Sequence, residues 1–479
     1  MGFAYDQVLY PGFPLAQTHP DRLATIAGLL GMRALPPDRC RVLELGCGDG
    51  GNLIPMALGL PQSQFTGIDL AEQAVARGRT VIQALGLENI SLRQMDLTKA
   101  GADLGEFDYV LAHGVYSWVP PEVRDALLRI SRANLAPDGV AYVSYNAYPG
   151  FHRREMFRGM MLHHVRSVRD PAGRYQQAVQ LVEDLAKCKL DGELARLLFD
   201  EQLQHLSETA PWVLYHDDLA GTNRAFYFHE FAAEARRHHL QYLAEADFVE
   251  MQAETDPEPV AEALERFAGG DVVAREQYRD FIRGRRFRQT LLCREEVVLD
   301  RSLQPDRIKE LYIASEARPV SSQPDLREGV AEEFRGPRGA VLETDSAVAK
   351  IALCRLAGVW PQSIRFSDLG AVGEAARLAE ILFQGYRVGL LELHTLAPQF
   401  AATAGDHPVA SPLARLQAQQ GAVVTTLRHT LIEVDDAIDR RLLQLLDGTR
   451  NREALLEGVR GEEIETRLDR LAKEALLLG

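Results

Sequence analysis

Short apolar runs alternate with amphipathic stretches over the first 150 residues of the chain. The runs are rich in β-branched and aromatic residues, which favours strands. These predicted strands cover 41–45, 65–69, 90–93, 107–113 and 140–145. The intervening segments 50–58, 70–85 and 121–135 have helical character, the second with apolar residues at intervals near 3.6. Strands separated by helices in this order predict an α/β fold with a parallel sheet and right-handed crossovers.

After residue 150 the pattern becomes mostly helical, and strand-like runs return near residue 296. The predicted helices of this middle part are 152–167, 172–188, 192–207, 225–239, 258–268 and 270–288. The later predicted strands are 296–300, 311–314, 340–343, 390–393 and 423–434. Small residues and prolines at 401–412 predict a loop. The tail predicts three short helices at 436–446, 452–459 and 462–478.

These patterns divide the chain into three predicted parts. Residues 1–150 form the α/β domain, 151–295 a mostly helical domain and 296–479 an α+β region. The end of this region, about 423–479, carries LLQLLDGTR followed by two helices and resembles a small winged-helix module. Three parts agree with a length of 479 residues at roughly 150 residues per domain.

A glycine-rich turn follows the first predicted strand and opens the helix after it. Gly46, Gly48 and Gly50 permit a tight turn and let the backbone approach a ligand. A G-x-G pattern is also found in dinucleotide enzymes, so it does not separate the two kinds of site. Glu44, two residues before the first glycine, favours a ligand with an amino-acid cation and a sulfonium over one with a pyrophosphate.

Two further acids follow the next two predicted strands. Asp69 ends the second strand, where a carboxylate accepts from ribose hydroxyls. Asp96 follows the third strand, where it could accept from an adenine amino group. Together with Glu44, these acids predict a nucleoside ligand that also carries an amino-acid moiety.

Charge and composition disfavour several classes of protein. Lys and Arg total 53 and Asp and Glu 68, and the net charge of −15 disfavours a broad nucleic-acid surface. No apolar run reaches the roughly 18 residues that span a bilayer, and no secretory signal begins the chain, so we expect a cytoplasmic protein without membrane insertion. The five cysteines are scattered without a C-x-x-C pair, which indicates free thiols and no zinc site.

Four separated motifs, ELGCGDGG (44–51), FTGIDL (65–70), RQMDL (93–97) and FDYVLAHGVYSWV (107–119), resemble those of class I S-adenosylmethionine-dependent methyltransferases. Further segments at 10–24, 143–150, 215–219, 286–293 and 391–394 narrow the resemblance. They are similar to bacterial methyltransferases with a methyltransferase regulatory domain, whose relatives include lysine methyltransferases of outer-membrane proteins. The resemblance implies a Rossmann-like fold, S-adenosylmethionine as cofactor and S-adenosylhomocysteine as product.

The resemblance also implies a set of cofactor-binding residues. It comprises the glycine turn, the three acids, their neighbours and a lid formed by the N-terminal segment. The expected residues are Gln17, His19, Glu44, Gly46, Cys47, Gly48, Gly50, Asp69, Leu70, Asp96, Leu97, His113 and Gly114. Tyr5 and Tyr10 belong to the same N-terminal segment.

Polar and aromatic residues at the ends of the fourth and fifth strands are the candidates for catalysis. The carboxyl ends of parallel strands form the ligand crevice, and aromatic surroundings lower the pKa of an amine while lone pairs orient it. We expect Tyr116, and next Tyr10, to orient the amine, with His113 or Asn146 as supporting acceptors. Trp118 completes the cluster. Core packing is the alternative for each single aromatic residue.

The leading hypothesis is an N-methyltransferase that acts on lysine side chains of a protein or peptide. The alternative is a small-molecule or natural-product methyltransferase on the same core. The large accessory region favours a macromolecular acceptor, and methyl transfer to nucleic acid is disfavoured by charge. The apolar stripe of segment 152–167 predicts either a homodimer contact or intrachain packing. The winged-helix-like tail is expected either to present the substrate or to stabilise the chain.

Overall fold

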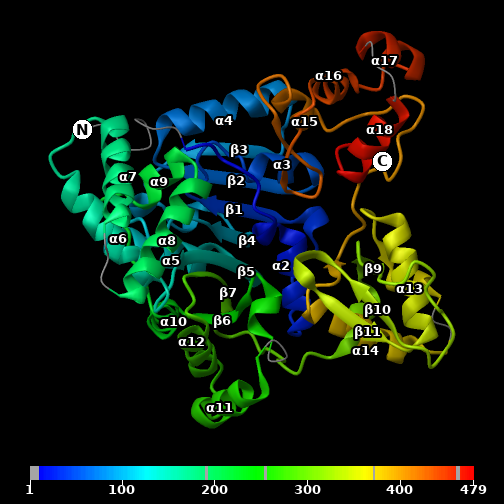
Figure 1. Cartoon of the computed structure of the whole chain (residues 1–479), viewed down its shortest axis with the longest axis horizontal. Coiled ribbons are helices and arrows are strands. Elements are labelled where there is room, and N and C mark those ends of the chain that lie inside the picture. Colours follow the sequence, from blue (N-terminus) through cyan, green and yellow to red (C-terminus); the bar gives the residue numbers. More distant parts are fainter. Residues whose placement is uncertain (1–9, 189–191, 253–255, 371–372, 460–463) are drawn as a thin grey trace.

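A seven-stranded sheet in the order β3-β2-β1-β4-β5-β7-β6 forms the centre of the molecule (Figure 1). The computed structural model describes residues 10–188, 192–252, 256–370, 373–459 and 464–479. The first five strands are β1 (Arg41–Leu45), β2 (Gln64–Asp69), β3 (Ile90–Gln94), β4 (Phe107–Ala112) and β5 (Leu135–Asn146). They pair in parallel, which confirms the predicted parallel sheet.

Two further strands extend the sheet beyond residue 150. β7 (Phe287–Arg294) pairs antiparallel with β5, and β6 (Leu240–Glu245) pairs antiparallel with β7. Both lie in the part predicted to be helical, so the boundary expected at residue 150 does not follow the sheet. The helix expected over 270–288 is wrong at its end, because α12 (Val272–Arg283) stops before β7 begins.

Helices cover both faces of the sheet and bury its strands on both sides. α2 (Pro20–Leu29), α3 (Leu53–Gly59) and α4 (Glu72–Leu85) contribute to the core on one face, and α5 (Pro121–Asn134) and α10 (Phe228–Arg237) to the core on the other. Adjacent strand residues separate accordingly: Val42 packs in the first core and Leu43 in the second. The carboxyl edge of the parallel strands stays uncovered by these helices and receives the segments described next.

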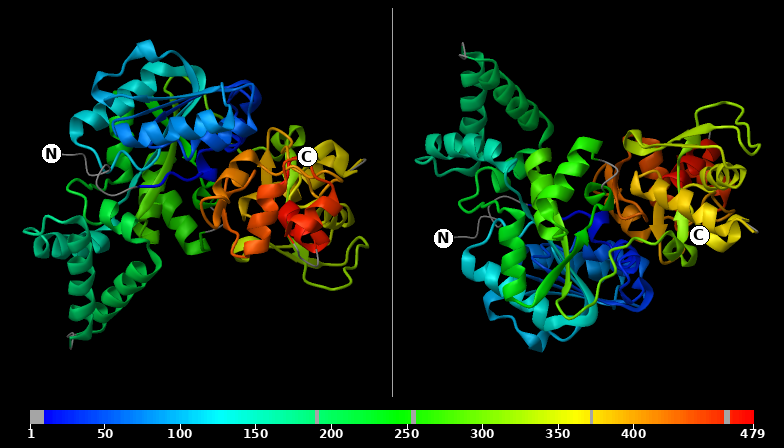
Figure 2. Two further views of the ribbon diagram at one scale, coloured as in Figure 1. Left: turned by 90° about the horizontal axis from the view of Figure 1, so that it is seen from above. Right: turned by 90° about the horizontal axis from the view of Figure 1, so that it is seen from below.

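The helical part packs at the carboxyl edge and has a small core of its own. Phe157, Val165, Val182 and Leu214 belong to this core. Its helices are α6 (Phe151–His164), α7 (Pro171–Lys187), α8 (Glu193–Glu208) and α9 (Pro211–Asp217). The first three match predicted helices, whereas the short α9 was not predicted. Figure 2 shows that α7 and α8 project away from the sheet on the side opposite the C-terminal region.

The region after β7 begins with a part that shares the core of the sheet. Leu353 and Leu382 of this part pack in the same core as Leu243 and Leu291 of the sheet. Its strands are β8 (Tyr312–Ala314), β9 (Arg318–Pro319), β10 (Glu332–Arg335), β11 (Val341–Thr344), β12 (Ile364–Arg365) and β13 (Glu392–His394). Its helices are α13 (Ala347–Val359) and α14 (Ala375–Arg387), while α11 (Glu258–Ala268) precedes β7. The strand expected at 296–300 is wrong, because the Asp300 amide bonds to the end of α2 and not to a strand.

The last part of the chain forms a separate small module. Its core includes Leu442, Leu446, Leu468 and Leu471. The strand expected over 423–434 is two strands, β14 (Val423–Thr425) and β15 (Leu431–Glu433), which form a hairpin. The three predicted tail helices are present as α16 (Ala437–Leu445), α17 (Arg452–Val459) and α18 (Ile464–Lys473), and α15 (Pro412–Gln417) precedes the hairpin.

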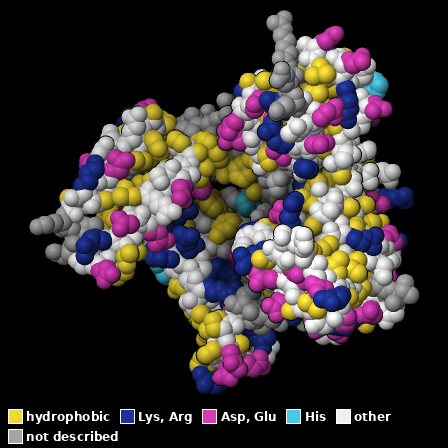
Figure 3. Space-filling view, turned by 45° about the vertical axis from the view of Figure 1, so that its right-hand side comes forward, with side chains coloured by type: hydrophobic (Ala, Val, Ile, Leu, Met, Phe, Trp, Pro, Cys, Tyr) yellow, Lys and Arg dark blue, Asp and Glu magenta, His cyan; other side chains and the backbone are white. Residues whose placement is uncertain are grey.

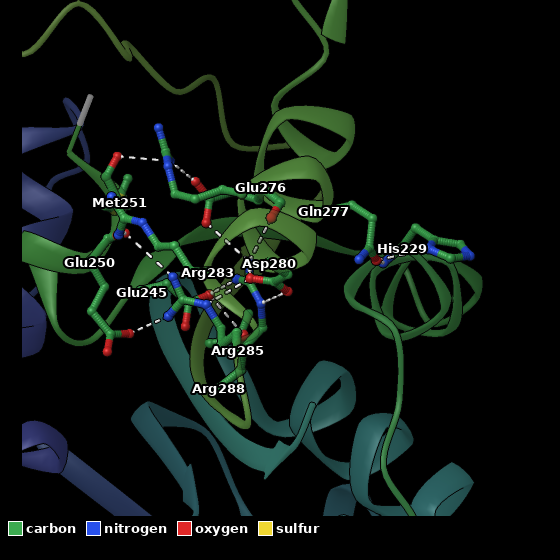
Figure 4. Close-up of polar contacts among 12 residues, drawn as sticks. His229, Glu245, Glu250, Met251, Glu276, Gln277, Asp280, Arg283, Arg285 and Arg288 are labelled. Atoms are coloured by element: carbon green, nitrogen blue, oxygen red, sulfur yellow. Dashed lines mark hydrogen bonds and ion pairs between the residues drawn. The ribbon is translucent and has the colours of Figure 1, made fainter. Parts of the chain in front are cut away.

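A buried cluster of charged side chains fixes β6, β7 and α12 to one another (Figure 4). Arg288 of β7 is fully buried and contacts Glu245 (2.5 Å), Asp280 (2.8 Å) and Glu276 (3.1 Å). Its guanidinium also lies 3.9 Å from the centre of the Phe228 ring. Because these charges are shielded from water, their mutual pairing is needed to offset the cost of burying them.

Among the described residues, no helix has both the length and the apolar character needed to cross a membrane.

Candidate functional site

The glycine turn after β1 has the backbone geometry that its sequence predicts. Gly46, Gly48 and Gly50 have φ angles of 79°, 55° and 77°, in the left-handed region that favours glycine. At Gly51 the constraint is space: a Cβ there would lie 2.2 Å from the carbonyl carbon of Gly12. The N-terminal segment therefore lies directly against the turn, as the expected lid would.

Glu44 places a buried carboxylate beneath the turn. Its side chain is 4% exposed, and Oε1 accepts a hydrogen bond of 2.8 Å from the Asn52 amide. Oε2 is buried and has no hydrogen-bond partner among the described residues. Burial raises the pKa of Glu44 to about 8. A buried carboxyl oxygen without a partner is suited to receive a cationic group from a ligand.

The two other predicted acids lie at the same edge of the sheet. The Asp69 carboxylate at the end of β2 accepts from the amides of Gly48 (2.8 Å) and Ala71 (2.7 Å). One oxygen of Asp96 accepts from the amide and hydroxyl of Thr98. Each carboxylate keeps lone pairs for a ligand, because an ionised carboxylate offers about four acceptor positions.

The neighbours of these acids line the same edge with apolar groups. Leu70 is 46% exposed, whereas Leu97 is buried. Cys47 is buried inside the turn, and burial raises the pKa of its thiol, so it is held as an uncharged small side chain. The structure thus brings together the predicted residues Glu44, Gly46, Cys47, Gly48, Gly50, Asp69, Leu70, Asp96 and Leu97.

A cavity of about 620 Å³ opens beside this edge, between the ends of β4 and β5 and the helices α6 and α8. Five residues predicted from the sequence line it: Tyr10, His113, Gly114, Trp118 and Asn146. The carboxyl ends of two neighbouring strands and the N-terminal segment therefore meet at one concave surface, as expected for the crevice of a parallel sheet.

His113 is held in a defined protonation state at this cavity. Its Nδ1 lies 2.9 Å from the Tyr142 hydroxyl, which itself donates to Gln289 Oε1 at 3.0 Å. Because the Tyr142 proton is used on Gln289, the His113 Nδ1 must be the donor, and Nε2 keeps its lone pair. Burial lowers the pKa of His113 to about 4, so the ring is neutral at pH 7 and can accept a hydrogen bond.

Tyr116 is not at the cavity, and the prediction that it orients an acceptor is corrected. Its side chain is fully buried, and its hydroxyl donates to Glu234 at 2.5 Å. The ring packs against Phe226 and Phe231, with centroids 5.0 and 5.2 Å away. Tyr116 is thus a core residue with a satisfied hydroxyl.

Tyr10 lines the cavity, and its ring packs edge-on against Trp212 of α9, with 4.8 Å between the ring centroids. Gln17 is half-buried in a 3-10 turn, Ala16–Thr18, at the end of the N-terminal segment. His19 caps α2 by accepting from the Asp21 amide, and its ring lies 5.4 Å from the His429 ring. Tyr5 lies outside the described residues.

Asp217, at the end of α9, is a cavity residue that sequence reasoning did not select. Its carboxylate lies 3.9 Å from Arg154 and has no hydrogen-bond partner in the described part of the chain. Burial raises its pKa to about 6. By contrast, the cavity carboxylate of Glu201 is held by Arg153 (2.9 Å) and Arg286 (3.2 Å).

Asn146 connects Asp217 to the sheet. The Asn146 amide donates to Asn223 at 2.7 Å, and Asn223 donates to the Asp217 carbonyl at 2.8 Å. Segment 215–219 carries part of the family resemblance, but its sequence gives no sign that it approaches β5. Asn52, directly after the glycine turn, contacts His429, and these two residues lie too far apart in sequence for any local pattern to join them.

Three family models match separate parts of the chain. A family model described as "Methyltransferase domain" matches residues 42–139, one described as "Predicted methyltransferase regulatory domain" matches 210–294, and one described as "PKMT, C-terminal winged helix domain" matches 406–475. The resemblance to a winged-helix module at the end of the chain is thus confirmed.

Two curated relatives from one organism match the chain over different lengths. The uncharacterised protein RP789 of Rickettsia prowazekii is 33% identical, over 95% of this chain and 85% of its own length. RP028 of the same organism is 32% identical over 50% of this chain and 96% of its own length. The structure of PKMT2, a protein lysine methyltransferase from Rickettsia typhi, is 28% identical and covers 98% of this chain and all of that one, with a TM-score of 0.85. It has also been solved in complex with AdoHcy, S-adenosylhomocysteine.

Proposed function

Since the chain belongs to the class I S-adenosylmethionine-dependent methyltransferases that carry a methyltransferase regulatory domain, we propose that it methylates lysine side chains of a protein or peptide. The observation that carries the proposal is the cavity at the carboxyl ends of β4 and β5, where a carboxylate without a hydrogen-bond partner and a neutral histidine share one surface. The relationship to PKMT2 supports a protein as the acceptor.

S-adenosylmethionine is the cofactor, as the sequence predicted, and it supplies a methyl group already activated by a sulfonium. The residues present fit it, because Glu44 offers a buried oxygen without a partner beneath a turn in which the space beside Gly48 is open. Glu44 would hold the amino-acid cation, Asp69 the ribose hydroxyls and Asp96 the adenine amino group. The N-terminal segment would cover the donor and exclude water.

Asp217 and His113 are proposed to prepare the acceptor. A lysine arrives as an ammonium, and its nitrogen must lose a proton before its lone pair can attack. With a pKa of about 6, Asp217 is ionised at neutral pH and can attract the ammonium and take its proton. The open cavity lets this proton pass to water, while the lone pair of His113 Nε2 accepts from a remaining N–H and orients the nitrogen.

The aromatic rings of the cavity assist this step. Tyr10 and Trp118 line it, and the buried Trp118 indole N–H has no hydrogen-bond partner among the residues described. Aromatic faces attract an ammonium and its methylated products, and a low-dielectric wall favours the neutral amine. Asn146, through Asn223, holds the segment that carries Asp217.

Surface charge argues against nucleic acid as the acceptor. Figure 3 shows Lys and Arg side chains interspersed with Asp and Glu over the face in view. A phosphate backbone is bound by a continuous basic surface, and the chain has a net charge of −15. A positively charged lysine is the acceptor that agrees with this charge.

Donor binding should release a proton from Glu44 at neutral pH. With a pKa of about 8, Glu44 is mostly protonated before binding, and it ionises when it pairs with the donor's ammonium. Between pH 6 and 7.5 the affinity should therefore rise with pH. Isothermal titration calorimetry at pH 7, in two buffers of different ionisation enthalpy, measures the released protons. Release that is unchanged in E44Q would contradict this role.

Partition of a labelled methyl group tests the acceptor class. Extract from cells that lack this chain is separated into protein and small-molecule fractions, and each is incubated with the enzyme and methyl-labelled S-adenosylmethionine. The proposal expects the label in the protein fraction. The label should remain with the protein after acid precipitation and should become soluble after protease digestion. Label confined to the small-molecule fraction would instead favour the small-molecule methyltransferase and reject a protein acceptor. The cytoplasmic location and the homodimer remain predictions.

A further inference from the structure

The C-terminal winged-helix module reaches the donor site through one side chain. Asn52 begins α3 directly after the glycine turn, and its side chain is 5% exposed. Its amide meets three separate parts of the chain: Glu44 beneath the turn, Thr18 and Leu15 of the N-terminal segment, and His429 of the module. Figure 1 shows the orange C-terminal segment beside α3.

The hydrogen atoms of this junction can be assigned from chemistry. Glu44 Oε1 lies 2.8 Å from the Asn52 Nδ2, which can only donate, so this oxygen accepts from it. The Leu15 amide only donates, so the Asn52 Oδ1 faces it at 3.0 Å. The His429 Nε2, 2.8 Å from the same oxygen, must therefore carry the proton and donate to it. His429 thus holds the amide in the orientation that donates to Glu44.

The turn that carries His429 is built to hold this position. His429 lies between β14 and β15, is 5% exposed and has a φ of 59°, a conformation that a residue other than glycine rarely adopts. The turn is fixed by a bond between the Thr426 and Thr430 hydroxyls (2.8 Å) and by the Leu427 amide, which donates to the Ala475 carbonyl (2.8 Å).

The neighbouring Arg428 anchors the turn to the rest of the C-terminal region. Its guanidinium bonds both oxygens of Glu392 at 2.6 and 2.8 Å and lies 4.0 Å from the centre of the Trp360 ring. The turn therefore cannot shift relative to Glu392 and Trp360 without breaking these contacts, which restrict the movement of the neighbouring His429.

We propose that His429 is a positioning residue for donor binding, and that the winged-helix module completes the donor site through the chain His429–Asn52–Glu44. Loss of the His429 contact leaves the Asn52 amide held by Leu15 and Thr18 without the module, which weakens its hold on Glu44 and on the N-terminal segment over the donor. By linkage, donor binding and docking of the module stabilise each other. The inference requires only that the chain binds S-adenosylmethionine and is independent of the methyl acceptor.

Two substitutions at position 429 separate positioning from simple stability. Asn tolerates the left-handed conformation, so H429N keeps the turn, but its side chain is too short to reach Asn52. Gln is less suited to this conformation, yet its amide N–H lies about where the His Nε2 does, so H429Q keeps the contact. H407N is the matched control, because His407 is an exposed residue of the same C-terminal region.

The first readout is the affinity for S-adenosylhomocysteine by calorimetry. Loss of one buried hydrogen bond predicts about 10-fold weaker binding in H429N. H429Q should bind within about 3-fold of the unchanged chain although it unfolds at a lower temperature, and H407N should be unchanged. Equal affinity of H429N and the unchanged chain, or equal losses in H429N and H429Q, would overturn the proposal.

Hydrogen exchange provides a second readout that does not depend on turnover. S-adenosylhomocysteine should slow exchange of the amides of 426–431 in the unchanged chain, because binding fixes Glu44, Asn52 and His429 together. The slowing should be lost in H429N and retained in H429Q. Protection confined to the glycine turn and absent from 426–431 in the unchanged chain would show that the module is not coupled to the donor site.

Discussion

Replacing Asp217 by asparagine should lower the rate of lysine methylation by about 10²- to 10³-fold, the range expected for loss of a positioned proton acceptor. The substitution keeps the size of the side chain, and the backbone carbonyl that receives Asn223 is unaffected. Donor affinity should remain unchanged, since Asp217 belongs to the acceptor side of the site. Initial rates at saturating donor, together with calorimetry of S-adenosylhomocysteine, separate the two effects.

The pH profile gives the control for this prediction. The Asp217 carboxylate is the active form, so kcat/KM should rise as the pH passes its pKa of about 6 and should lose this limb in D217N. D200N is the matched variant, because Asp200 is exposed on α8 and does not line the cavity. A D217N enzyme that keeps full kcat, or keeps the limb near pH 6, would exclude Asp217 as the proton acceptor.

Replacing Arg288 by methionine should destabilise the fold by about 3–5 kcal/mol, the cost of leaving buried charges without their partner. Methionine fills much of the space of the arginine side chain, so the loss reports charge more than volume. Glu245 and Asp280, both fully buried, would lose their ion pair with Arg288, although Asp280 keeps its ion pair with Arg285. Urea unfolding followed by tryptophan fluorescence measures the change.

Two further variants show whether charge is the cause. R237M removes an exposed arginine, whose surface ion pair contributes at most about 1 kcal/mol. Adding E245Q to R288M should recover part of the lost stability, because it removes one of the uncompensated charges. If R288M costs no more than R237M, the buried cluster does not hold β6 and β7 in the sheet.

The proposed donor half of the site lies in local sequence, and for that reason the position of its residues at one edge of the sheet could be predicted. Glu44 and the three glycines lie in one turn, and Asp69 and Asp96 each follow a strand, so the order of parallel strands alone brings them to one edge. The same rule placed His113 and Asn146 correctly at the cavity. Such predictions succeed because strand direction fixes position before any packing is known.

The positions of other residues depend on packing between segments that are distant in sequence. Tyr116 follows β4 at the expected edge, but Phe226, Phe231 and Glu234 from more than a hundred residues later enclose it and satisfy its hydroxyl. The helix predicted over 270–288 overlaps the beginning of β7, because the charged side chain of Arg288 does not indicate a buried strand. Its charge is neutralised only by residues of β6 and α12, which the sequence of the strand does not contain.

The residues that complete the site are separated in sequence in the same way. Asp217 reaches Asn146 through Asn223, and His429 reaches Glu44 through Asn52. Neither chain of contacts follows a sequence period, and the motifs that contain Asn146 and Asp217 do not show that the two segments meet. Their chemistry becomes visible only when burial and hydrogen-bond partners are known for each side chain.

Tandem mass spectrometry of a methylated acceptor protein tests the central claim most directly. Proteins labelled by the purified enzyme are digested, and the methyl group is located on individual residues. The account predicts mass increases of one or more methyl groups on lysine Nε atoms, present with the unchanged enzyme and strongly reduced with D217N. Methyl groups located on carboxyl, hydroxyl or arginine side chains, with lysines unmodified, would contradict it.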